Sequence, residues 1–123
     1  MKHDVTNRKD IENLVNTFYE KVKLDTHIGY FFLDIVNVNW EKHLPIMYDF
    51  WENVLFYSGN YSGNPMDVHI KLNEIAPIKI EHFQRWLEIF NETVDELFEG
   101  ETSFRLKQRA SSIATVMQIK ILN

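Results

Sequence analysis

Apolar residues recur three and four positions apart along four segments of this 123-residue chain. That spacing places side chains on one face of an α-helix, whereas a half-buried strand would show apolar residues at every second position. Alternation with period two is not sustained over any useful length. The pattern predicts an all-α fold, and the length predicts one domain spanning residues 1–123.

The four expected helices are bounded by turn and capping residues. Thr6 or Asn7 can cap the first, and Gly100 is a suitable stop for the third. Pro45 lies inside the second helical pattern and lacks the N–H that an internal turn needs, so that helix either begins a few residues late or is kinked. The helices are expected at about Ile11–Leu24, Asn39–Tyr57, after Pro77 to Gly100, and from Ser103 onwards.

Composition excludes several classes of function. The net charge of −5 and the pI near 5.5 argue against binding to a phosphate backbone. With no cysteine there is no disulfide, thiolate nucleophile or zinc knuckle. No stretch is long and apolar enough for a membrane span, and the first residues lack the apolar core of a signal peptide. We therefore expect a cytoplasmic protein that binds neither nucleic acid nor membrane.

A lone histidine stands out in the short stretch GNPMDVHIKL, Gly63 to Leu72. Asn64 can cap a helical turn there, and Pro65 suits the first helical position. The stretch follows the loop YSGNYSGNP, so turn residues bracket it. Two interpretations stay open: His69 is a surface or half-buried histidine on a connector, or it is a metal ligand.

Three more polar residues fall on inner faces of the long helices. Tyr19 follows Phe18 on the first, His43 precedes an apolar stripe on the second, and Trp86 flanks the stripe of the third. Taken alone, each is more often structural: a Tyr or Trp there is usually a core residue whose polar atom is satisfied locally, and a single His is usually near the surface. Together with His69 they suit a haem pocket, which needs one neutral imidazole on the iron and hydrogen-bonding groups opposite.

Five segments carry a resemblance to a known family. In residue type, order and spacing they resemble the truncated haemoglobins of the third group, and they span nearly the whole chain. The glycine pairs typical of the first two groups are absent. The resemblance implies a two-over-two helical sandwich around non-covalent haem b. The segments are FYEKV (18–22), HLPIMYDFW (43–51), YSGNPMDVH (61–69), HFQRWLEIF (82–90) and RLKQRA (105–110).

The resemblance also implies roles for individual residues. His69 matches the proximal iron ligand, and Tyr19, His43 and Trp86 match the distal, catalytic side chains. Phe32, or its neighbour Phe31, matches a phenylalanine that packs on the porphyrin. The further expected apolar contacts with the ring are Met47, Phe50, Trp51, Ile113 and Met117, with Leu72 and Phe83 on a proximal or core side.

The expected iron is pentacoordinate or weakly hexacoordinate, with a position for O₂, NO, CO, peroxide or nitrite. Tyr19 and Trp86 would donate hydrogen bonds to the ligand, while His43 would donate, bind the iron or gate the pocket. These donors favour redox or detoxification chemistry, such as NO dioxygenation or peroxide reduction, over oxygen storage. Turnover would need a separate reductase. The alternatives are a haem-based sensor or sequestering protein, and a haem-free helical interaction domain.

Overall fold

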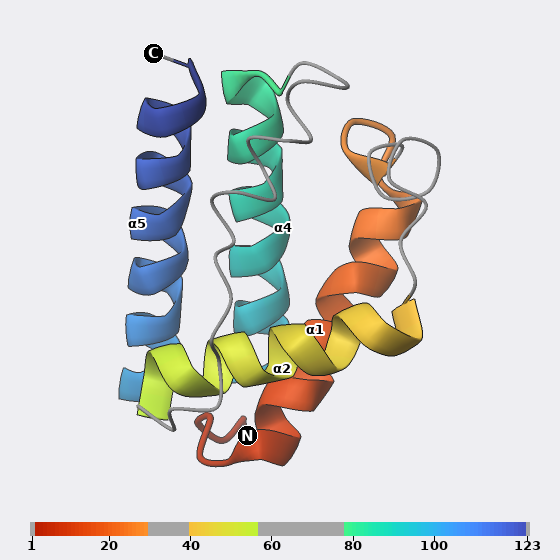
Figure 1. Cartoon of the computed structure of the whole chain (residues 1–123). Coiled ribbons are helices and arrows are strands. Elements are labelled where there is room, and N and C mark those ends of the chain that lie inside the picture. The colour runs from red at the N-terminus through yellow and green to blue at the C-terminus, as the bar shows by residue number, and fades with distance from the viewer. Residues whose placement is uncertain (1, 30–39, 57–77, 123) are drawn as a thin grey trace.

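Four α-helices form the part of the chain that the computed structural model describes, residues 2–29, 40–56 and 78–122, with side chains to Ile119 (Figure 1). They are α1 (Arg8–Leu24), α2 (Trp40–Phe56), α4 (Ile80–Leu97) and α5 (Glu101–Leu122). These ranges contain no strand, and the all-α prediction is confirmed. No helix within them is long and apolar enough to cross a membrane.

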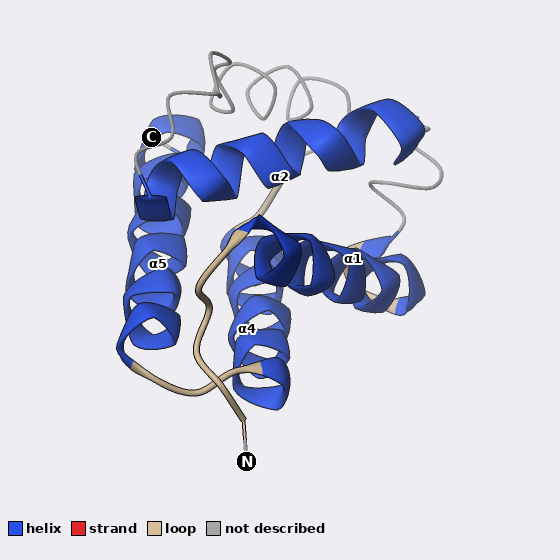
Figure 2. Ribbon diagram, turned by 90° about the horizontal axis from the view of Figure 1, so that it is seen from below, coloured by secondary structure: helices blue, strands red, loops and turns tan. Residues whose placement is uncertain are grey.

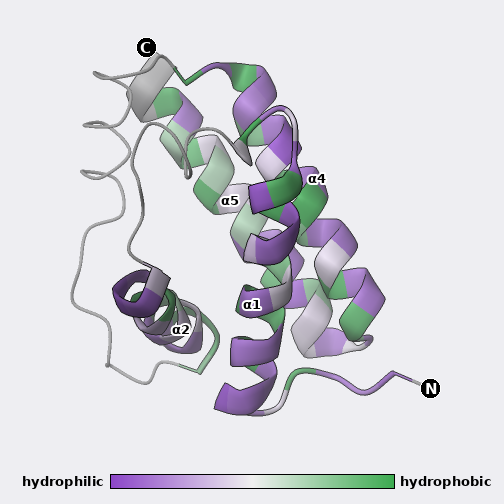
Figure 3. Ribbon diagram, turned by 90° about the vertical axis from the view of Figure 1, so that its right-hand side faces the viewer, coloured by the Kyte–Doolittle hydropathy of each residue, from purple (hydrophilic) through white to green (hydrophobic). Residues whose placement is uncertain are grey.

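The helices are arranged as two pairs, α1 with α2 and α4 with α5. α4 and α5 run antiparallel side by side, and α1 packs against α4 (Figure 1). α2 crosses α1 (Figure 1). One end of α2 lies beside α5, which it contacts (Figure 2). Figure 3 shows hydrophobic and hydrophilic residues mixed along each helix, as expected for helices that bury one face. This arrangement brings the inner faces of α1, α2 and α4 together.

α1 begins and ends at polar residues that the backbone uses directly. The Asn7 side chain accepts the N–H of Asp10 at 3.0 Å, so Asn7, one of the two predicted candidates, is the cap. At the other end, the Asp25 carboxylate accepts N–H groups of His27 and Ile28, and Arg85 Nε of α4 donates to it at 2.7 Å. Burial alone would raise the pKa of Asp25, but these donors lower it below its ordinary value. Asp25 thereby fixes the end of α1 against α4.

α2 runs through Pro45 without interruption. The helix therefore does not begin late, because it is already formed at Trp40. Pro45 is exposed, so the carbonyl that loses its usual N–H partner lies near solvent. α2 keeps Trp51 and Leu55 buried and packs its half-buried apolar side chains on the core.

The start of α5 is capped by a residue from the other end of the sequence. Asp4 Oδ2 accepts the N–H of Thr102 at 2.8 Å, and Oδ1 accepts the Ser103 N–H at 2.8 Å and its hydroxyl at 2.6 Å. α5 consequently begins at Glu101, two residues before the predicted start. Gly100 has φ +141°, and a Cβ there would lie 2.6 Å from the Asp4 carboxyl carbon.

These hydrogen bonds also shift the ionisation of Asp4. Burial by itself would raise the pKa of the carboxyl, but the Ser103 hydroxyl and the N–H groups of Thr102, Ser103 and Val5 lower the pKa to about 2. The carboxylate is thus stabilised in the folded chain relative to the unfolded chain, where its ordinary pKa is 3.8.

Replacing Asp4 by alanine should remove this cap. We expect Asp4→Ala to lower the free energy of unfolding by about 1–2 kcal/mol near neutral pH. Because the folded pKa lies below the unfolded one, the difference should persist above 3.8 and shrink as pH falls towards 2. Urea denaturation of both proteins at several pH values measures it. Glu99→Gln, which changes an exposed carboxylate beside the turn, is the control; an equal loss there would contradict the assignment.

Candidate functional site

Tyr19 of α1 and His43 of α2 meet where the two helices cross. Tyr19 Oη lies 3.3 Å from His43 Nε2, and the ring centroids are 5.3 Å apart. Tyr19 is only 7% exposed, whereas His43 is half-buried. The tautomer of His43 decides which of the two donates the hydrogen bond. The structure therefore brings together two of the predicted distal residues.

The Tyr19 phenol keeps its proton. Burial raises the pKa of Tyr19 well above its ordinary value, because the phenolate would lose its hydration in this apolar setting. A neutral phenol has one O–H donor and can also accept, so it can hydrogen-bond to His43 or to a ligand. The site thus holds a hydrogen-bond donor whose protonation does not change near neutral pH.

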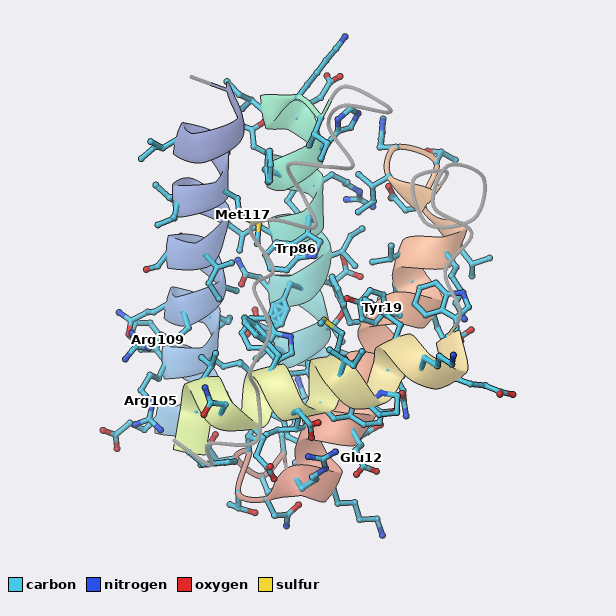
Figure 4. The ribbon with its side chains drawn as sticks, in the orientation of Figure 1. Glu12, Tyr19, Trp86, Arg105, Arg109 and Met117 are labelled. Atoms are coloured by element: carbon cyan, nitrogen blue, oxygen red, sulfur yellow. The ribbon has the colours of Figure 1, made fainter. Side chains whose placement is uncertain are left out.

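Trp86 lies on α4, the helix that packs beside α1, which carries Tyr19 (Figure 4). Its ring stacks on Phe90 at 5.6 Å between centroids, with an angle of 15°. Phe18 packs edge-on against both predicted donors, with its ring centroid 5.8 Å from that of Trp86 and 5.1 Å from that of Tyr19. The aromatic core therefore fixes the orientation of Trp86, which is half-buried.

The predicted apolar contacts divide into two sets. Met47, Phe50 and Ile113 pack on the core but remain half-buried, so the core covers only part of their surface. The others are buried: Trp51 stacks on Phe90 at 4.8 Å, and Met117 lies between α5 and α4 (Figure 4). Their proposed contact with a porphyrin stays a prediction. The buried set is Trp51, Phe83 and Met117.

Several predicted residues lie outside the described part of the chain. They belong to the segments 30–39 and 57–77, which include the short stretch Gly63 to Leu72. Their assigned roles stay predictions. These residues are Phe31, Phe32, His69 and Leu72.

Trp40 is a neighbour of the site to which the sequence analysis gave no role. Its ring lies 5.2 Å from Tyr19 and 5.7 Å from His43, and the Lys23 ammonium lies 4.3 Å from its centroid. A usable signal was present: Trp40 and His43 are three residues apart on α2, while Tyr19 and Lys23 are four apart on α1. What the sequence did not show is that these two faces pack on each other.

The described residues fit one face of a haem. A buried phenol and an imidazole, with polar atoms 3.3 Å apart, adjoin apolar side chains that the core only partly covers. An apolar macrocycle needs apolar side chains around it, and its small ligands need nearby donors. A helical sandwich that can place such a pair against a haem fits the globin class.

Comparison with known proteins agrees with this class. No family model matches the chain. Over 121 residues the chain is 31% identical to the group 3 truncated haemoglobin ctb of Campylobacter jejuni. The aligned part covers 96% of this chain and 93% of the relative. The crystal structure of the group III truncated haemoglobin from Campylobacter jejuni matches with a TM-score of 0.84 at 31% identity, covering 98% and 95% of the two chains. The chain therefore belongs to the group 3 truncated haemoglobins, a family defined by haem-based binding of small ligands, and the resemblance is confirmed.

Phe90 is the residue on which the orientation of the donors depends. We expect Phe90→Ala to lower the free energy of unfolding by about 3–5 kcal/mol, because it removes a fully buried ring. Phe90→Leu should cost less than half as much, since most of the apolar volume remains. Urea denaturation measures both. Phe104→Ala is the control, as Phe104 is 58% exposed on α5; a loss as large as that of Phe90→Ala would contradict this view of the core.

Proposed function

We propose that this chain binds haem b without covalent attachment and uses it for redox or detoxification chemistry on small ligands. His69 would coordinate the iron, with Tyr19, His43 and Trp86 on the opposite side. The observation that carries the proposal is the Tyr19–His43 pair, 3.3 Å apart and set in an aromatic core. Membership of the group 3 truncated haemoglobins supports the haem.

The haem would supply a binding position for O₂, NO, CO or peroxide. The chain's own contribution is hydrogen bonding. Because Tyr19 is buried and stays protonated, its O–H can donate to a ligand without competition from water. The indole N–H of Trp86 is a donor only. Each such hydrogen bond is worth about 1–3 kcal/mol, which is enough to slow ligand release substantially.

Slow release favours reaction over oxygen storage. His43 is half-buried, so its imidazole has access to both the Tyr19 hydroxyl and the outer side of the site. An imidazole can take up and release a proton near neutral pH. The pair can therefore carry a proton between solvent and a ligand, which NO dioxygenation or peroxide reduction would use. The electrons would come from a separate reductase.

The haem assignment is tested by an absorption spectrum. After haem addition we expect a stoichiometric Soret band in the ferric and ferrous protein and a shifted band with CO. His69→Ala should lose or strongly weaken haem binding, because the side chain that would coordinate the iron is removed. His27→Ala is the matched control, since His27 is an exposed histidine that we assign no role. A colourless wild-type protein, or full binding by His69→Ala, would contradict the proposal.

The roles of the donors are tested by O₂ dissociation. We expect Tyr19→Phe and Trp86→Phe each to raise the dissociation rate constant by about tenfold or more, because each removes one donor while keeping an aromatic ring. Stopped-flow displacement of O₂ by CO in the ferrous protein measures it. Tyr48→Phe is the control, because the Tyr48 hydroxyl bonds to Asn16 on the outside of the α1–α2 pair. Unchanged dissociation in both site variants would remove the argument for slow release.

A further inference from the structure

Four side chains connect α1 and α2 in two neighbouring pairs. Tyr19 and His43 form the inner pair, with their polar atoms 3.3 Å apart. Lys23 and Trp40 form the outer pair, with the ammonium 4.3 Å from the centre of the indole. The inner pair contains the buried Tyr19, whereas both members of the outer pair are half-buried. The outer pair thus lies one helical turn from the inner pair on each helix.

Trp40 also touches both members of the inner pair. Its ring lies edge-on to His43 with an interplanar angle of 81°, and it is tilted by 59° to Tyr19. Side chains on a helix lean towards its N-terminus, so the His43 ring leans over the turn that carries Trp40. The indole therefore packs against the imidazole on the side of the preceding turn, with 5.7 Å between the ring centroids.

Lys23 holds the indole from the side of α1. Its ammonium lies over the ring and also 3.3 Å from the Glu20 carboxylate, one turn earlier on the same helix. The contact is a cation–π interaction, which is attractive because the ring face carries negative potential. Trp40 is therefore attached to α1 through Lys23 and packs on His43 within α2.

We propose that Trp40, held by Lys23, is a positioning residue that keeps His43 turned inward against Tyr19 and so limits the access of small ligands to the site. This rests on the proposed function, because it concerns the ligand side of a haem pocket. Loss of the indole, or of the ammonium that holds it, lets His43 rotate outward. Ligands then reach the site faster, and less often find His43 in place as a hydrogen-bond donor.

CO is a suitable probe, because its stretching band reports hydrogen bonding and its association rate reports access. We expect Lys23→Met to raise the CO association rate constant about twofold to fivefold, the effect expected from losing a partly exposed cation–π contact. Trp40→Ala should raise the CO association rate constant further. It should also add a second C–O stretching band, from molecules in which His43 has turned away from the ligand. Flash photolysis and infrared spectroscopy of the ferrous protein measure the two.

Conservative variants separate positioning from a merely structural role. Lys23→Arg keeps a cation, so its CO association rate constant and C–O stretching band should be those of the wild-type protein. Trp40→Phe keeps an aromatic ring, so both quantities should stay close to the wild-type values. Lys21→Met is the matched control: Lys21 lies on α1 but pairs with Glu92 and Glu96 of α4, so its loss should leave CO association unchanged.

The outcomes distinguish this proposal from the one on which it rests. If Lys23→Met has the wild-type CO association rate constant, or if Lys21→Met raises it equally, the positioning role of Trp40 is wrong. The proposed haem binding is not affected by either result. A wild-type protein that forms no CO complex overturns the proposed function instead. If Trp40→Ala does not fold, Lys23→Met and Lys23→Arg carry the test, because they change a half-buried side chain at the edge of the fold.

Discussion

The packing around Phe90 is the interaction on which the rest of the structure depends. Phe90 is 1% exposed, stacks on Trp51 and Trp86, and meets the edge of Phe18. These rings come from α1, α2 and α4, so one cluster sets the mutual orientation of three helices. Trp86 belongs to the cluster itself, and Tyr19 is the next residue after Phe18. The donors are therefore oriented by the same contacts that stabilise the fold.

Charged groups join the ends of the helices. Asp25 binds Arg85 where α1 ends, and Asp4 caps α5. Both carboxyls have lowered pKa values, because several donors converge on each and outweigh the cost of burial. Inside the fold the cost of burial dominates instead: burial raises the pKa of Tyr19 and keeps its phenol neutral. Helix ends thus use ionised groups, whereas the candidate site uses a neutral donor.

Membership of the group 3 truncated haemoglobins implies haem-based binding of small ligands, and the geometry of this chain is the basis for the function proposed above. Under the proposed function, the phenol–imidazole pair at the crossing of α1 and α2 would hold a ligand for reaction rather than release it quickly. The proposed role of Trp40 adds a reason for the position of His43. In this view Lys23, at the end of α1, influences ligand access through two ring contacts and without touching the ligand.

The sequence by itself determined the four helices, because apolar periodicity depends on residues within a few positions of each other. It narrowed the first cap to Thr6 or Asn7, of which the structure shows Asn7, and the resemblance of five segments gave the family. It also identified Tyr19, His43 and Trp86 as site candidates. Only the tertiary structure decided that Asp4 caps a helix 98 positions away, that α2 continues through Pro45, that Trp51 stacks on Phe90, and that Trp40 lies beside Tyr19. Those outcomes depend on which helix faces meet, and that is set by the packing of the whole core rather than by any local pattern.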